Sequence, residues 1–196
     1  MCLVIAMYFF FVALASLPLS TVVSIFFISP LLITFLSSIV LNERIGIHRV
    51  TSVITALIGV MFVMKPGTSE FHPEMLLAFG SAVSYAIFQI FTRSLKSDGN
   101  LPALITIQHL CYFFSALPLL AFNWSGGLSS TGNMSFDFLL RGTVSPTLTE
   151  IIYISICAGA VLFLSLASSF AYRNVEASLI APFEYIAIPV SVVWGI

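Results

Sequence analysis

Long stretches without a single charged side chain constrain this sequence most. Residues 1–42, 99–136 and 151–172 contain no Asp, Glu, Lys or Arg. Because a helix needs about 20 apolar residues to cross the hydrocarbon core of a bilayer, the first stretch is long enough for two crossings. Only 8% of the residues are charged and 59% are apolar, whereas soluble domains have about 25% charged residues. The sequence predicts an all-α integral membrane protein and argues against a soluble enzyme.

The charge-free stretches and the connections between them divide the chain into a bundle of about seven transmembrane helices. Leu17-Pro18-Leu19 is the natural corner within the first stretch. The one long connection is 123–148, in which 137–140 is a candidate turn of interfacial helix. We expect helices over 2–17, 20–41, 47–65, 73–93, 102–122, 149–172 and 177–196.

Lysine and arginine residues collect in alternate connections. The connections at 42–48, 94–101 and 173–176, with the residues next to them, hold five of the seven basic residues, and the opposite side holds Lys65 and Arg141. Basic residues in short loops favour the cytoplasmic side. We therefore expect a cytoplasmic N-terminus and an outer loop at 123–148.

A weak internal repeat relates the two ends of the chain at an offset of 158 residues. Residues 13–20 align with 171–178, and both segments are the short hinge between two predicted helices. The charge pattern places the two hinges on opposite sides of the membrane, so the copies run in opposite directions. Inverted repeats of this kind are characteristic of secondary transporters.

Several segments in succession resemble the EamA-type transporters of the drug/metabolite transporter superfamily. The segments are Ala13-Leu14-Ala15-Ser16-Leu17-Pro18-Leu19-Ser20, Ile25-Phe26-Phe27-Ile28-Ser29-Pro30-Leu31, Leu41-Asn42-Glu43-Arg44-Ile45-Gly46, Gly59-Val60, Val63-Met64-Lys65-Pro66-Gly67, Ala177-Ser178 and Ala181-Pro182-Phe183-Glu184-Tyr185. The resemblance implies ten helices in two inverted five-helix repeats, of which this chain is a fragment that matches helices three to nine. Residues 1–66 would then be the C-terminal part of the first repeat, and 67–196 a second repeat that is incomplete at its C-terminus.

The repeat and the resemblance together favour a secondary transporter, importer or exporter, that moves a small metabolite across a membrane by alternating access. The alternative is a seven-helix receptor or sensor. We expect no enzyme activity, catalytic residue, metal or cofactor, because the sequence contains none of the usual nucleotide, hydrolase or zinc motifs. The expected partners are a small-molecule substrate, with coupling to protons as a candidate, and the lipid bilayer; a homodimer is a candidate assembly. Nucleic acid is not expected, since the net charge is −1. A multi-pass location in the plasma membrane, the inner membrane of a bacterium, follows from the resemblance.

Glu184 is the sharpest candidate for function, because it is the only charged residue in 177–196. Carboxyl groups inside a membrane are costly and usually face a cavity. Small residues share its predicted helix face, whereas Leu179 and Ile186 lie opposite. No Lys or Arg lies in the apolar part of a helix to pair with it, which leaves a proton, a cation or the substrate. The alternative is a structural role in which the acid binds a neighbouring helix.

Other polar residues of the predicted helices complete a candidate substrate pathway. Ser24 and Ser29 belong to a hydroxyl-rich part of the second helix, which Pro30 is expected to kink, although such hydroxyls more often bind their own backbone. Tyr85 and Gln89 share one helix face, and His109 is either a packing residue or a proton carrier. The candidate pathway residues are Glu184, Tyr185, Ser24, Ser29, Pro30, Tyr85, Gln89 and His109.

The predicted orientation is testable by cysteine labelling in intact cells. A cysteine at Ser130 should react with a membrane-impermeant maleimide, because the charge pattern places the loop at 123–148 outside. A cysteine at Ser97 should react only after the membrane is permeabilised. The reverse pattern would overturn the orientation.

Overall fold

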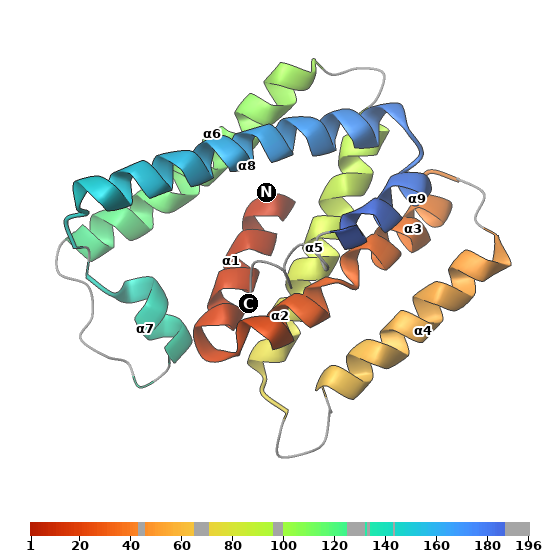
Figure 1. Cartoon of the computed structure of the whole chain (residues 1–196), viewed down its shortest axis with the longest axis horizontal. Coiled ribbons are helices and arrows are strands. Elements are labelled where there is room, and N and C mark those ends of the chain that lie inside the picture. Colours follow the sequence, from red (N-terminus) through yellow and green to blue (C-terminus); the bar gives the residue numbers. More distant parts are fainter. Residues whose placement is uncertain are drawn as a thin grey trace.

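The computed structural model of the chain describes residues 1–42, 46–64, 71–95, 100–124, 132, 134–142 and 144–186. Within these ranges every regular element is a helix (Figure 1). The elements are α1 (Cys2–Ser16), α2 (Leu19–Phe26), α3 (Ser29–Val40), α4 (Ile47–Met64), α5 (Glu74–Ser94), α6 (Leu101–Trp124), α7 (Met134–Leu140), α8 (Leu148–Asn174), α9 (Ala177–Ile180) and the 3₁₀ helix η1 (Ala181–Ile186).

Four helical segments of the described residues are long and apolar enough to cross a membrane. They are Leu19–Val40, which combines α2 and α3, Glu74–Ser94, Leu101–Trp124 and Leu148–Asn174. The shorter α1 is also apolar, and six of the seven predicted ranges coincide with α1, α2 with α3, α4, α5, α6 and α8. The prediction of an all-α membrane bundle is confirmed.

The last predicted helix differs from the expectation of a continuous α-helix over 177–196. The chain forms one α-helical turn, α9, and then continues as the 3₁₀ helix η1, while 187–196 lies outside the described residues. Pro182 has no amide hydrogen, so it cannot donate to the carbonyl four residues before it. The tighter turn places Glu184 on a short 3₁₀ segment rather than in the middle of a long helix.

Helix α5 lies at the centre of the bundle against α1, α2 and α3 (Figure 1). Its small residues permit this close packing: Ala78, Ala82 and Ala86 are completely buried. At Gly80 an added Cβ atom would lie 3.0 Å from the ring of Phe9 on α1. The Ser81 hydroxyl donates to the Ala6 carbonyl of α1 at 2.7 Å, which ties the two helices together.

The corners α1–α2 and α8–α9 have nearly the same backbone. Leu17 has φ −121° and ψ 151°, and Val175 has φ −123° and ψ 154°. The next residues, Pro18 and Glu176, have φ −56° and −55° and ψ 140° and 131°. In both corners the carbonyl of this second residue accepts the amides three and four residues further on. The corners are 158 residues apart, so their geometry supports the repeat inferred from the sequence.

The second predicted helix is interrupted between α2 and α3. Phe27 and Ile28 form a turn there, and α3 begins with Ser29-Pro30. The break follows from Pro30, because a proline removes one backbone hydrogen bond and its ring disfavours a continuous helix. The expected interruption is therefore present, and α3, which begins there, packs against η1.

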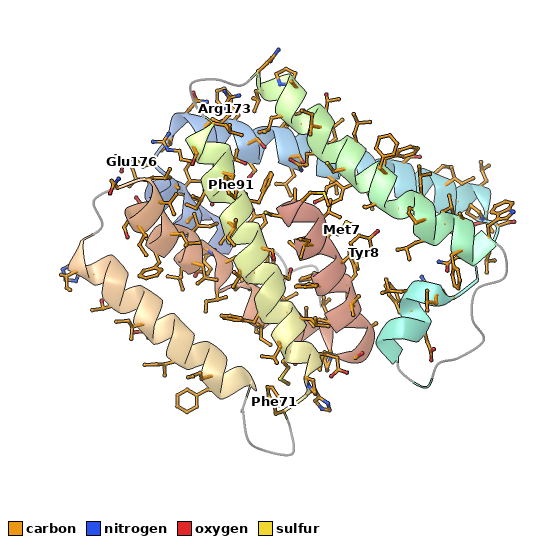
Figure 2. All side chains as sticks on the ribbon, turned by 180° about the vertical axis from the view of Figure 1, so that it is seen from behind. Met7, Tyr8, Phe71, Phe91, Arg173 and Glu176 are labelled. Carbon is orange, nitrogen blue, oxygen red and sulfur yellow. The ribbon has the colours of Figure 1, made fainter. Side chains whose placement is uncertain are left out.

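Two arginines join the C-terminal ends of α5 and α8. Arg93 donates from Nη1 to the carbonyl of Arg173 at 3.0 Å, and Arg173 donates from Nη2 to the carbonyl of Leu95 at 3.4 Å. Figure 2 shows Arg173 and Glu176 at this end of α5, with Phe71 at the other end. Because cations favour helix C-termini, the pair fixes the two helix ends next to each other.

Helices α6 and α8 cross on the outside of the bundle (Figure 1). In the most apolar 18-residue stretch of α8 no residue is buried, and large side chains such as Phe163 and Leu164 are exposed. An apolar surface of this kind is compatible with lipid and not with water. The Tyr8 hydroxyl of α1 donates to the carbonyl of Ser115 of α6 at 2.8 Å, which links these two helices.

The small-residue face of α5 generates a stability prediction. Ala82→Leu should lower the free energy of unfolding by about 1–3 kcal/mol, because the added side chain has no space in the buried core that α5 forms with α1 and α2. The matched control is Ala160→Leu on the exposed surface of α8, which should have little effect. Thermal unfolding in detergent measures both variants. Equal shifts of the melting temperature would contradict the packing argument.

Candidate functional site

The Glu184 carboxyl accepts hydrogen bonds from two tyrosines on different helices. Its Oε1 atom lies 2.7 Å from the hydroxyl of Tyr172 on α8 and 2.9 Å from the hydroxyl of Tyr85 on α5. Tyr172 is only 1% exposed and Glu184 is partly buried. The sequence offers no lysine or arginine partner for this acid, and the search for such partners overlooks the tyrosine donors, whose hydrogen bonds fit the alternative in which the acid binds neighbouring helices.

Gln89 extends this polar cluster along α5. It lies one helical turn after Tyr85 and is 2% exposed. Its Nε2 atom donates to the Tyr85 hydroxyl at 2.7 Å and to the Ser168 hydroxyl of α8 at 3.2 Å. Glu184, Tyr172, Tyr85, Gln89 and Ser168 thus form one hydrogen-bonded group, which we name the polar cluster.

The polar cluster borders a cavity of about 540 Å³ between α2, α3, α5, α8 and η1. This volume is in the range of small-molecule sites. The residues that line it are Phe26, Phe27, Ser29, Tyr85, Leu164, Ala167, Ser168, Ala171, Tyr172, Ile180, Phe183 and Glu184. The cavity is therefore mostly apolar, with the polar groups concentrated around the carboxyl.

Aromatic rings form the side of the site that belongs to the first half of the chain. The Phe26 ring lies 5.5 Å from the Tyr85 ring and 5.4 Å from the Phe10 ring, measured between centroids. At the repeat offset of 158, Phe26 corresponds to Glu184 and Phe10 to Ser168. In the predicted repeat, these two pairs of positions are therefore aromatic in the first half of the chain and polar in the second.

The structure brings some of the candidate pathway residues together. Glu184, Tyr85 and Gln89 belong to the polar cluster, and Ser29 lines the cavity. Tyr185 lies beside it, with its ring 6.2 Å from that of Phe27.

The other candidates lie apart from the cluster. Pro30 is buried at the start of α3 and acts there through the helix break. Ser24 is exposed and donates to the Ser20 carbonyl at 2.7 Å, which is the backbone role left open by the sequence. His109 lies 2.9 Å from the Ile105 carbonyl through Nδ1 and lines a different cavity beside α6.

Tyr172 and Ser168 are the functional candidates that the sequence underestimates. By position in the sequence, Tyr172 is next to Arg173 and fits an anchor at the membrane surface as well as a gate, and Ser168 shares its helix spacing near the same surface. Their spacing of four residues on one face of α8 was the available signal. Within the described residues no group of His, Cys, Asp and Glu is arranged to hold a metal.

Comparison with known proteins relates the chain to transporters. Residues 1–65 match the EamA-like transporter family. The chain is 22% identical over 176 residues to an S-adenosylmethionine uptake transporter of Rickettsia prowazekii, and this match covers 90% of the chain and 53% of the relative. It is 25% identical over 179 residues to a riboflavin transporter of Vibrio cholerae, which covers 91% of the chain and 54% of the relative.

A third relative, an uncharacterized transporter of Helicobacter pylori, is 25% identical over 195 residues, which is 98% of the chain and 59% of the relative. The chain thus spans little more than half the length of these relatives. No solved structure matches it significantly. The family match and the relatives support the resemblance to the EamA-type transporters of the drug/metabolite transporter superfamily, and the relatives are named as transporters rather than enzymes.

The shared carboxyl generates a test of the polar cluster. Glu184→Leu should reduce the free energy of unfolding by about 1–3 kcal/mol, because the hydroxyl of Tyr172 would remain buried without its acceptor. Adding Tyr172→Phe should recover part of this loss, since both partners are then apolar. Adding Tyr153→Phe, an exposed tyrosine of the same helix, is the matched control and should recover nothing. Thermal unfolding in detergent measures all these variants. A loss of stability that is simply the sum of the two single losses would contradict the predicted recovery.

Proposed function

We propose that this chain belongs to a secondary transporter that moves a small metabolite across the plasma membrane by alternating access. The observation that carries this proposal is the Glu184 carboxyl, which is held by two tyrosines at the edge of a cavity of about 540 Å³ inside an apolar bundle. Two of the relatives are named for the substrates S-adenosylmethionine and riboflavin. They support a small metabolite as the solute here.

The corner geometry supports the organisation into two repeats. In this proposal residues 1–66 contribute part of one repeat and 67–196 part of the other. Their equivalent corners at Leu17 and Val175 have the same backbone conformation. The solute would lie where elements of both repeats meet, between Phe26 of the first and Glu184 of the second. Sites at the interface of inverted repeats are the usual arrangement in secondary transporters.

The carboxyl offers a way to couple solute movement to protons. In a dry environment an ionised acid loses its hydration, so the neutral form is favoured unless a cation compensates. Both tyrosines donate to the same oxygen of Glu184, so they do not use the second oxygen. We propose that a proton or a solute group with positive charge engages the acid there. Closure of the site would follow when the charge is neutralised, because the charged form resists a closed, dry state.

The coupling proposal predicts the behaviour of Glu184→Gln. The amide keeps an oxygen that accepts from both tyrosines but it cannot exchange a proton. Uptake into proteoliposomes, with radiolabelled S-adenosylmethionine and riboflavin as probes, should therefore lose its pH dependence while membrane insertion is retained. Glu150→Gln at the exposed start of α8 is the matched control and should keep the original profile. An unchanged rate and pH profile for Glu184→Gln would show that the acid is only structural.

A further inference from the structure

A second, smaller cavity also borders Tyr85 and is lined by residues of α1, α5, α6 and α8. Its volume is about 140 Å³, and it shares Tyr85 and Ser168 with the larger cavity. The sequence contains only two glutamines, Gln89 and Gln108, and both line this cavity. None of the described residues that line it carries a charge.

The direction of the hydrogen bonds fixes which end of the Gln89 amide is available. A tyrosine hydroxyl has one hydrogen, and that of Tyr85 is donated to Glu184. The Tyr85 oxygen can therefore only accept from Gln89, which must present its amino group. The Gln89 Oε1 atom is left over, and it is buried without a hydrogen-bond partner among the described residues.

Gln108 on α6 repeats this arrangement. Its Nε2 atom donates to the hydroxyl of Ser165 on α8 at 3.4 Å. Its Oε1 atom is likewise buried, and the part of the chain that the structure describes offers it no partner. A buried acceptor without a donor costs about 1–3 kcal/mol. Two such acceptors beside one cavity indicate that it is built to receive hydrogen-bond donors.

We propose that this small cavity binds an uncharged N–H-bearing group of the transported solute, such as a primary amide, a ureide edge or the amino group of a heterocycle. The inference rests on the proposed function, since it adds a second polar subsite next to the carboxyl. Two carbonyl oxygens select N–H donors, and the lack of a charged lining residue disfavours an ion. A cationic group of the same solute would find its partner at Glu184 instead.

The test compares two uncharged probes of nearly equal shape, benzamide and acetophenone. Benzamide has an amino group where acetophenone has a methyl group, so only benzamide has N–H donors. Binding to the chain in nanodiscs is measured by saturation-transfer NMR, and the signal of empty nanodiscs is subtracted. Benzamide should bind at least about tenfold more tightly, the equivalent of one hydrogen bond to a buried acceptor. Equal affinity of the two probes would overturn the proposal without the need for any variant.

Substitutions then locate the binding. Gln89→Met and Gln108→Met should each weaken benzamide binding about tenfold and leave acetophenone binding unchanged. The matched control is Asn123→Leu, which removes another amide whose oxygen is buried without a partner among the described residues, but at a different cavity. This variant should bind benzamide as the unsubstituted chain does. Benzamide binding that survives both methionine substitutions would also overturn the subsite.

The outcome is separable from that of the transport experiment. Glu184→Gln retains an acceptor for Tyr85, so it should keep the preference for benzamide over acetophenone whether or not uptake loses its pH dependence. A missing preference in an otherwise active transporter would contradict the subsite alone. A clear preference in a chain whose uptake is insensitive to Glu184→Gln would contradict the proton coupling alone.

Discussion

The structure around the cavity depends on one requirement, which is that a carboxyl group among apolar helices needs hydrogen-bond donors. Glu184 obtains them from Tyr172 on α8, 12 residues away in sequence, and from Tyr85 on α5, 99 residues away, so three elements must meet at one oxygen atom. Tyr85 can reach this point because the small residues of α5 bring that helix into the centre of the bundle. The direction of its hydrogen bond then determines how Gln89 is oriented.

Much of this arrangement can be predicted from the sequence. The charge-free stretches indicate the helices because a bilayer excludes unpaired charges. Glu184 stands out as an acid in an apolar stretch, and the spacing of four residues between Tyr85 and Gln89 indicates a common helix face. The hinge at residues 13–20 and its counterpart at 171–178 also emerge from sequence alone, although few identities support them.

The remainder depends on contacts between helices, which the local sequence does not encode. Tyr172 looks like a surface anchor until the corner after α8 folds η1 back against it, and Ser24 looks like a pathway residue although its hydroxyl binds its own helix. The hydrophobic periodicity likewise does not predict the change from an α-helix to a 3₁₀ helix at Ala181, because the same residues fit both helix types. A proline such as Pro182 was the available warning.

The twin corners have a mechanical consequence. In each corner the amide of the first residue, Leu17 or Val175, donates to the preceding helix. The carbonyl of the second residue, Pro18 or Glu176, accepts from the following helix. Neither corner contains a glycine. Hydrogen-bonded corners without glycine should hold the angle between their paired helices, so a tilt of one helix should move the other with it. The interruption at Phe27 and Ile28 differs from the corners, because Pro30 cannot donate a backbone hydrogen bond there, and we expect bending at this interruption directly beside the cavity.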